Sequence, residues 1–237
     1  MIGVTIVFAL RGIARTAVPD TVRADAPLLG PRIRGWYLGL MAPLAEQLIR
    51  WHVHPDLLTY AQLGVSVLAG GAFAVGWMFL AGWLTILAGT LDILDGFVAR
   101  RVGVAGPRGA LVDSLVDRYA EFATFLGLGA WFREEGWVLV AVVIAAFGSL
   151  MVSYTRARAE GLGLQLDGGS AQRPERYVIL GLGAVLSSLV GHLACPLLGY
   201  QTHLILVLAV MVLAVAAGWT ALQRAVRAVQ ALPRGVP

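Results

Sequence analysis

Four aspartates between residues 91 and 121 are the side chains of this sequence best suited to chemistry. Asp92 and Asp95 stand three residues apart and Asp113 and Asp117 four apart, so each pair shares one face if its segment is helical. The residues around them are those of membrane helices, where an ionised carboxylate is unfavourable by at least a few kcal/mol. Four carboxylates together also repel one another unless cations lie among them. Hard divalent cations such as Mg²⁺ bind oxygen ligands and serve phosphate chemistry, so the two pairs predict a metal site.

Membrane helices must position these pairs, and the sequence contains six apolar stretches of suitable length. We predict spans near residues 57–79, 81–102, 109–132, 136–159, 175–195 and 201–224. The first aspartate pair then belongs to the second span and the second pair to the third span. The two helical faces together would form one cluster of four carboxylates.

A helix of a different kind is predicted before the spans, over residues 33–53. Its apolar residues recur at helical spacing, and its polar positions are Arg34, Glu46 and Arg50. The apolar positions are Trp36, Leu40, Leu44, Leu48 and Trp51. This pattern predicts an amphipathic helix on the membrane surface, and a helix packed on another part of the protein is the alternative. We therefore predict an all-α integral membrane protein with a cytoplasmic N-terminal segment, residues 1–53, and a six-helix membrane domain, residues 54–237.

Composition and the distribution of charge agree with a multi-pass membrane protein. Of the 237 residues, 58% are hydrophobic and 14% are charged, and all eighteen basic residues are arginines. The loops after the first and fifth spans carry no arginine, and the loop after the third carries only Arg133, beside Glu134 and Glu135. The positive-inside rule therefore places both termini and the aspartates on the cytoplasmic side of the plasma membrane.

Several other classes of protein are excluded by the same sequence. Cys195 is the only cysteine, which excludes an internal disulfide and a thiolate cluster. The chain has no basic patch or aromatic platform for nucleic acid, and no glycine-rich phosphate-binding fingerprint. Aspartates that only pair with arginines to hold helices together would explain one or two acids, but not four in register.

An ion or proton pathway is a further alternative, because carboxylates inside a helix bundle also mark transporters. That interpretation does not explain the glycines beside the aspartates. Gly96 directly follows Asp95, and Gly109 lies four residues before Asp113, so each leaves room for a ligand or a neighbouring backbone. Arg100 could reach a diphosphate held by the metal.

The aspartate stretch resembles the signature of the CDP-alcohol phosphotransferase family, D-x2-D-G-x2-A-R-x8-G-x3-D-x3-D, at all eight fixed positions. Members of that family join an alcohol to the phosphatidyl or similar group of a CDP-linked donor and release CMP. The resemblance implies six membrane helices, a polar cavity that faces the cytoplasm, and a homodimer. It also implies that Asp92, Asp95, Asp113 and Asp117 hold two Mg²⁺ ions, with Mn²⁺ as an alternative, and that Asp117 is the general base.

The resemblance further assigns residues to the CDP site, namely Thr59, Asp95, Gly96, Ala99, Arg100 and Gly109. Thr59 is included because many members carry Pro-Asn-x-x-Thr before the first span, and residues 55–59 here read Pro-Asp-Leu-Leu-Thr. Asp56 departs from that pattern, and we predict it to be a helix cap.

A second stretch, from Ser153 to Arg176, resembles the phosphatidylinositol phosphate synthase branch of the family. That branch has S-Y-x-K-A-R-A-E, then D-G-G, then R-P-E-R, and it binds the phosphate of inositol phosphate through three basic residues. The matching positions are Arg156, Arg176 and Arg224, and Arg156 replaces a lysine with a larger group of different hydrogen-bond geometry. Arginines at the ends of spans also obey the positive-inside rule without binding a ligand, so that alternative stays open.

The two resemblances imply Mg²⁺-dependent transfer of a phosphatidyl group from CDP-diacylglycerol to inositol 1-phosphate, giving phosphatidylinositol phosphate and CMP. Alternatives within the family are phosphatidylglycerophosphate synthase, a CDP-archaeol-dependent inositol phosphate transferase and di-inositol-phosphate phosphate synthase. The alternative outside the enzymes is a cation-coupled transporter. The expected partners are a CDP-linked lipid, inositol phosphate, membrane lipids and a second copy of the chain, and not nucleic acid.

Overall fold

A computed structural model describes residues 30–164, 173–198 and 203–232, and within these ranges the chain forms seven α-helices and no strand. They are α2 (Gly30–Arg50), α3 (Pro55–Ala74), α4 (Met78–Val102), α5 (Pro107–Trp131), α6 (Gly136–Glu160), α7 (Arg173–Leu198) and α8 (Leu204–Ala231). Every predicted span corresponds to one of these helices, and the segment of residues 33–53 corresponds to α2. The largest difference is at the end of α8, predicted at residue 224 and found at Ala231.

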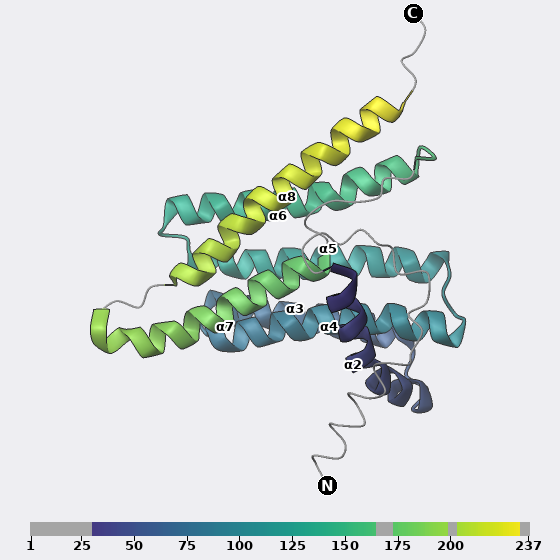
Figure 1. Ribbon diagram of the computed structural model, residues 1–237, viewed down its shortest axis with the longest axis horizontal. Coiled ribbons are helices and arrows are strands. Elements are labelled where there is room, and N and C mark those ends of the chain that lie inside the picture. The colour runs from purple at the N-terminus through teal and green to yellow at the C-terminus, as the bar shows by residue number, and fades with distance from the viewer. Residues whose placement is uncertain (1–29, 165–172, 199–202, 233–237) are drawn as a thin grey trace, which may run out of the picture.

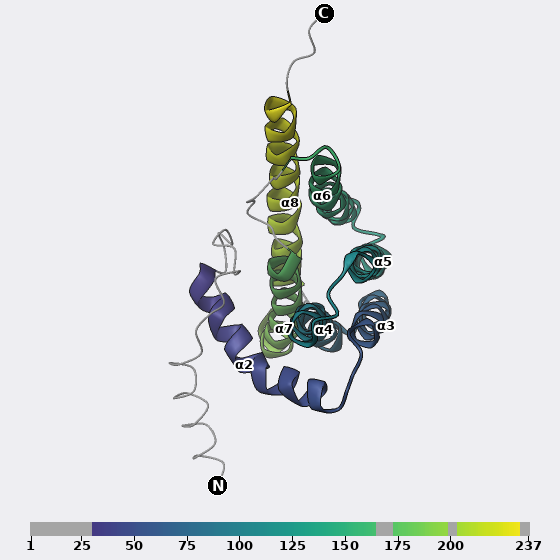
Figure 2. The same ribbon diagram turned by 90° about the vertical axis from the view of Figure 1, so that its right-hand side faces the viewer.

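Helices α3 to α8 lie alongside one another, whereas α2 crosses the bundle (Figures 1 and 2). Helix α3 packs against both α4 and α5, α4 packs against α7, and α8 packs against α6 and α7. Successive helices from α3 to α8 run in alternating directions, so α4, α6 and α8 end toward the end of the bundle at which α3, α5 and α7 begin (Figure 1). We call this end the aspartate end, since all four aspartates of the predicted site lie toward it.

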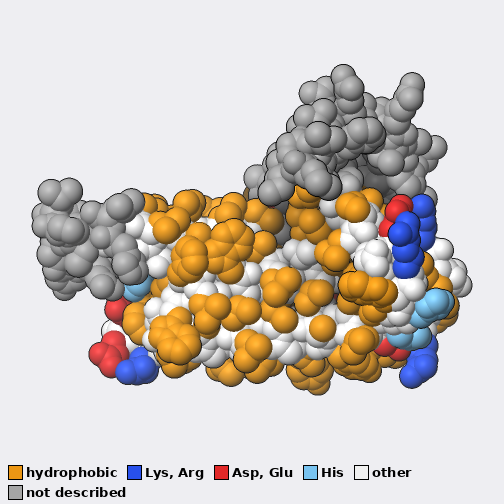
Figure 3. Space-filling view, turned by 90° about the horizontal axis from the view of Figure 1, so that it is seen from below, with side chains coloured by type: hydrophobic (Ala, Val, Ile, Leu, Met, Phe, Trp, Pro, Cys, Tyr) orange, Lys and Arg blue, Asp and Glu red, His pale blue; other side chains and the backbone are white. Residues whose placement is uncertain are grey.

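Four helices, α3, α4, α6 and α8, are long and apolar enough to cross a membrane. Helix α5 is of similar length, but it carries Asp113, Asp117, Arg118 and Glu121 among its 25 residues. One face of the molecule shows hydrophobic side chains across its middle and charged side chains toward its two ends (Figure 3). Large exposed apolar surfaces of this kind are rare on soluble monomers. These features describe a multi-pass membrane protein.

Glycines allow the central helices to approach closely. A Cβ added at Gly127 of α5 would lie 1.9 Å from the carbonyl oxygen of Gly70 on α3, and one added at Gly70 would lie 2.3 Å from the carbonyl oxygen of Ala123. Helices α4 and α7 meet in the same way, since a Cβ at Gly82 would lie 2.6 Å from the carbonyl oxygen of Gly181. Small residues are the usual means by which membrane helices pack backbone to backbone.

Helix α2 is attached to the membrane-spanning helices through one of its faces. Ala45 is fully buried in a cluster with Leu94 and Val98 of α4, and the hydroxyls of Tyr37 and Thr90 are 2.6 Å apart. The predicted apolar stripe lies mostly on another face, where Trp36, Leu40, Leu44 and Trp51 are exposed. The helix therefore packs on α4 and still presents apolar side chains outward.

The prediction that Asp56 caps α3 is wrong. The N-cap is His54, whose Nδ1 accepts a hydrogen bond of 3.3 Å from the backbone N–H of Asp56. Pro55 explains the difference, because proline favours the first helical position and keeps the residue before it extended. Asp56 thus lies inside the first turn, where its negative charge favours the helix N-terminus.

Candidate active site

Three of the four aspartates come together at the aspartate end. Asp92 of α4 and Asp113 and Asp117 of α5 each present a carboxylate oxygen, and these oxygens lie within 4.8 Å of one another. Helix α3 brings the two aspartate-bearing helices into position, because it packs against both. The loop between them is short, since Gly103 ends α4 with a left-handed φ of 79° and Pro107 begins α5.

This group of oxygens fits a divalent cation. Carboxylate oxygens are the ligands that Mg²⁺ and Mn²⁺ prefer, and the side chain of Asp117 is only 2% exposed. Arg173 of α7 supplies positive charge at the same place: its guanidinium is 3.2 Å from Asp92 Oδ1 and also forms an ion pair with Asp117 Oδ2. The acids therefore face a cation, as the cost of burying several carboxylates requires.

Asp95 lies beside this group and is 4% exposed. Its Oδ2 accepts a hydrogen bond of 2.6 Å from the Thr59 hydroxyl of α3. Asp92 and Asp113 both act electrostatically on it, so it belongs to the same charged region. The structure thus joins Thr59 to an aspartate of the signature, although it places only three of the four carboxylates within mutual ligand distance.

Other residues expected at the donor site lie around the end of α4. The guanidinium of Arg100 folds over Gly96, where an added Cβ would lie 3.2 Å from Arg100 Nη1. Ala99 is half-buried and its carbonyl oxygen closes the helix by accepting from Gly103 and Val104. A Cβ added at Gly109 would meet nothing within 4 Å, so the space beside it is open.

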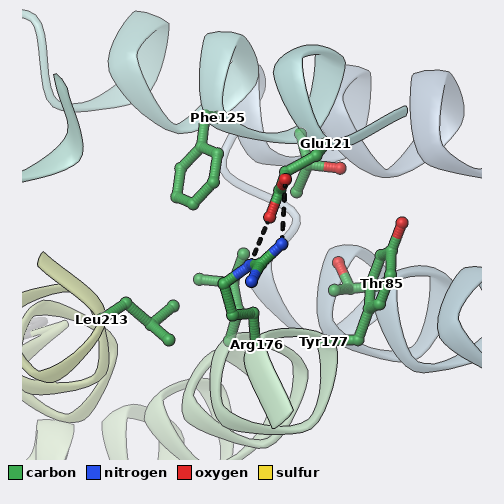
Figure 4. A pocket seen from close by; sticks show the side chains of 8 residues that line it. Thr85, Glu121, Phe125, Arg176, Tyr177 and Leu213 are labelled. Atoms are coloured by element: carbon green, nitrogen blue, oxygen red, sulfur yellow. Dashed lines mark hydrogen bonds and ion pairs between the residues drawn. The ribbon is translucent and has the colours of Figure 1, made fainter. Parts of the chain in front are cut away.

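The three arginines expected at the acceptor site all have partners. Arg176 of α7 points at Glu121 of α5, with Nε 2.6 Å from Oε1 and Nη2 3.2 Å from Oε2 (Figure 4). Arg156 pairs with Glu160 at 2.8 Å on the exposed end of α6. Arg224 of α8 donates to the Val152 carbonyl oxygen at 3.0 Å, and it lies within electrostatic range of Arg156 and Arg176. The structure thus gathers all three at the aspartate end, while residues 167–169 of the D-G-G motif lie outside the described residues.

Two cavities adjoin the Arg176–Glu121 pair. One is large enough for about a single water molecule and is lined by Thr85, Thr124 and Tyr177, as well as by the ion pair itself (Figure 4). The other is a groove of about 460 Å³ between α5 and α6, with Arg118 and Glu121 among its otherwise apolar lining. A buried ion pair therefore borders an apolar groove on this side.

Three residues that the structure places at or beside the aspartates, Gln62, Arg173 and Tyr177, were not predicted from the sequence. Gln62 donates to Asp117 Oδ1 at 3.1 Å and to the Tyr177 hydroxyl at 3.2 Å, and Arg173 bridges Asp92 and Asp117. One signal was present, because Gln62 follows Thr59 by three residues and so shares its helical face. Arg173 and Tyr177 are likewise four residues apart on α7.

The sequence matches one protein family and several curated relatives. The CDP-alcohol phosphatidyltransferase family profile matches residues 52–229. The phosphatidylinositol phosphate synthase of Mycobacteroides abscessus is 39% identical over 61% of this chain and 68% of its own length. That of Mycolicibacterium smegmatis is 35% identical over 84% of this chain and 88% of its own length.

Solved structures show the same likeness. The crystal structure of Mycobacterium tuberculosis phosphatidylinositol phosphate synthase with CDP-DAG bound has a TM-score of 0.68 and 30% identity, covering 82% of this chain and 98% of that one. A structure of the same enzyme in complex with manganese and citrate also has a TM-score of 0.68, covering 82% and 92%. The range matched by the family profile, residues 52–229, includes all four aspartates. The chain belongs to the CDP-alcohol phosphatidyltransferase family.

Proposed function

We propose that this protein transfers the phosphatidyl group of CDP-diacylglycerol to inositol 1-phosphate, producing phosphatidylinositol phosphate and CMP. The observation that carries the proposal is the meeting of Asp92, Asp113 and Asp117 oxygens within 4.8 Å, at an end of the bundle rich in arginine. The names of the relatives, phosphatidylinositol phosphate synthase, and the CDP-DAG bound to one of them support the choice of substrates.

The three aspartates and Asp95 would hold two Mg²⁺ ions, which Mn²⁺ could replace. Bound there, the cations would neutralise the diphosphate of the donor and the charge that develops on CMP. Asp117 accepts the proton of the attacking hydroxyl as that oxygen bonds to the phosphatidyl phosphorus and the bond to CMP breaks. The ion pair with Arg173 and the hydrogen bond from Gln62 keep its buried carboxylate fixed.

The donor site is assigned to the end of α4 and its neighbours. Thr59 orients Asp95 through its hydrogen bond, and Arg100 supplies a charged group close to the diphosphate. Gly96 leaves the space that the Arg100 guanidinium occupies, and Gly109 leaves open space on α5. The short side chain of Ala99 takes up little space in the last turn of α4, beside Gly96 and Arg100.

The acceptor site is assigned to Arg156, Arg176 and Arg224. Their positive charges lie close enough to repel one another, and a phosphate dianion would relieve that repulsion. Glu121 holds Arg176 through two nitrogen–oxygen hydrogen bonds, so the arginine is oriented before the acceptor binds. Two anionic substrates are thereby held together, which is catalysis by proximity and electrostatics.

The membrane arrangement extends the same proposal. Helices α3 to α8 form six spans in the plasma membrane, with α2 on its cytoplasmic surface, and the chain acts as a homodimer. Both termini and the active site face the cytoplasm, because the described arginines gather at the aspartate end and only Arg133 lies at the other. The exposed apolar stripe of α2 supports its place on the lipid surface.

An acceptor panel tests the proposed reaction. Purified protein is given labelled CDP-diacylglycerol, Mg²⁺ and, in separate reactions, inositol 1-phosphate, glycerol 3-phosphate, inositol or serine. We expect a labelled phosphatidyl product with inositol 1-phosphate and little with unphosphorylated inositol, which leaves the arginines without a phosphate. Equal use of glycerol 3-phosphate would contradict the assigned acceptor but not the reaction class.

A further inference from the structure

Gln62 is a polar side chain at the centre of the bundle, and none of its surface is exposed. A buried amide is unfavourable unless it forms hydrogen bonds. Its Nε2 donates to Asp117 Oδ1 at 3.1 Å and to the Tyr177 hydroxyl at 3.2 Å. The side chain of Gln62 on α3 thus joins α5 and α7 at the aspartate assigned as general base.

The orientation of this amide follows from chemistry. An ionised carboxylate only accepts hydrogen bonds, so Asp117 must face the N–H side of the amide. A flipped amide would put Oε1 of Gln62 against a carboxylate oxygen, and the two would repel. With the observed orientation Nε2 makes both contacts, and Oε1 has no hydrogen-bond partner within the described part of the chain.

The two oxygens of Asp117 therefore have different partners. Oδ1 accepts from the neutral amide of Gln62, and Oδ2 forms the ion pair with Arg173, which also contacts Asp92. The rotation of the carboxylate is fixed from two helices, α3 and α7. Partners that orient a metal ligand in this way commonly change metal affinity or activity by about 10- to 100-fold when they are removed.

Tyr177 is itself held in place by the packing of α4 on α7. A Cβ added at Gly89 would lie 2.8 Å from both Cβ and Cγ of Tyr177, so the tyrosine fits only because residue 89 has no side chain. The hydroxyl that receives the second hydrogen bond of Gln62 is consequently well positioned. The amide is anchored at Tyr177 and directed at Asp117.

We propose that Gln62 is a positioning residue for the reaction, which sets the orientation of the Asp117 carboxylate as metal ligand and as base. The role of Gln62 in catalysis rests on the proposed function. The effect of Gln62 on metal binding does not depend on which substrates the protein uses.

The test measures Mn²⁺ affinity of the purified full-length protein without substrates, and then CMP release at saturating Mn²⁺. Gln62→Met keeps the length of the side chain and removes the donor. We expect Mn²⁺ affinity and kcat each to fall by about 10- to 100-fold, while KM for CDP-diacylglycerol changes by less than about threefold. Ser66→Ala is the matched control, because Ser66 is equally buried one turn further along α3 and its hydroxyl has no hydrogen-bond partner among the described residues.

Unchanged Mn²⁺ affinity and kcat in a folded Gln62→Met protein would overturn the proposal, as would an equal loss in Ser66→Ala. If Gln62→Met does not fold, Tyr177→Phe replaces it, since it removes only the anchor of the amide. Its Mn²⁺ affinity should fall by about two- to tenfold, the effect of one neutral hydrogen bond, and no change would count against the proposal. If the parent protein releases no CMP, the proposed reaction fails, while the Mn²⁺ affinities still decide the role of Gln62.

Discussion

Asp117 combines two proposed roles, as metal ligand and as base, and a substitution can separate them. Asp117→Asn keeps an oxygen for the metal but cannot accept the proton of the attacking hydroxyl. We expect kcat to fall by about 10²- to 10⁴-fold, the usual contribution of a general base, and the affinity for CDP-diacylglycerol to fall much less. The measurement pairs equilibrium binding of the donor with steady-state kinetics. Equal losses in both would show that Asp117 only holds metal.

Arg176 also has two roles to separate, because it is ion-paired with the half-buried Glu121 and assigned to the acceptor phosphate. Arg176→Gln should raise the KM for inositol 1-phosphate by about 10- to 100-fold, since a charge-assisted hydrogen bond contributes about 1.5–3 kcal/mol. It should also lower thermal stability, because the Glu121 carboxylate loses its partner.

The double variant Glu121→Gln/Arg176→Gln distinguishes the two effects. It removes both charges, so its stability should recover, while its KM for the acceptor should stay high. Recovery of both properties would show that Arg176 is structural and does not bind the acceptor. Arg156→Lys is the conservative control at the neighbouring position and should retain most activity, since lysine stands there in the branch that the sequence resembles.

At the scale of helices, the contact between α3 and α5 determines whether the aspartates meet. Gly70→Ala places a Cβ 2.3 Å from a backbone oxygen of α5, so the helices must separate. We expect a loss of about 1–3 kcal/mol in stability, as for other overpacked cores, together with reduced activity. Gly71→Ala is the matched control, because nothing lies within 4 Å of its added Cβ. Equal melting temperatures of the two variants would contradict this account of the packing.

Much of this arrangement could be predicted from the sequence, because it depends on local patterns. Apolar runs with charged ends located the helices, and the spacing of Asp113 and Asp117 placed both on one helical face. The contacts of Gln62 and Arg173 could not be predicted in the same way, since they join residues 55 and 81 positions apart in the sequence. Such contacts depend on how closely α3, α5 and α7 pack. The hydrogen bond between Thr59 and Asp95 also joins two helices and could not be predicted from local patterns either.

At the scale of the whole molecule, the asymmetry of charge predicts the orientation in the membrane. The side chain of Glu134, between α5 and α6, is 80% exposed at the end opposite the aspartates, and Arg158 is exposed at the aspartate end. In a Cys195→Ser background, Glu134→Cys should react with a membrane-impermeant maleimide on intact cells. Arg158→Cys should react only after permeabilisation. The reverse pattern of labelling would contradict a cytoplasmic active site.

The proposed reaction requires that the aspartates form a divalent-metal site that drives transfer from a CDP-linked lipid. Its most direct test is CMP release from CDP-diacylglycerol by the purified protein, with inositol 1-phosphate and titrated Mg²⁺. The parent protein should release CMP only when a divalent cation is present, and Asp113→Asn should lower turnover by at least about a hundredfold, because several kcal/mol of charge stabilisation are lost. Asp56→Asn, in the first turn of α3, is the control and should remain active. Release of CMP without a divalent cation, or substantial turnover by Asp113→Asn, would contradict the proposed metal site.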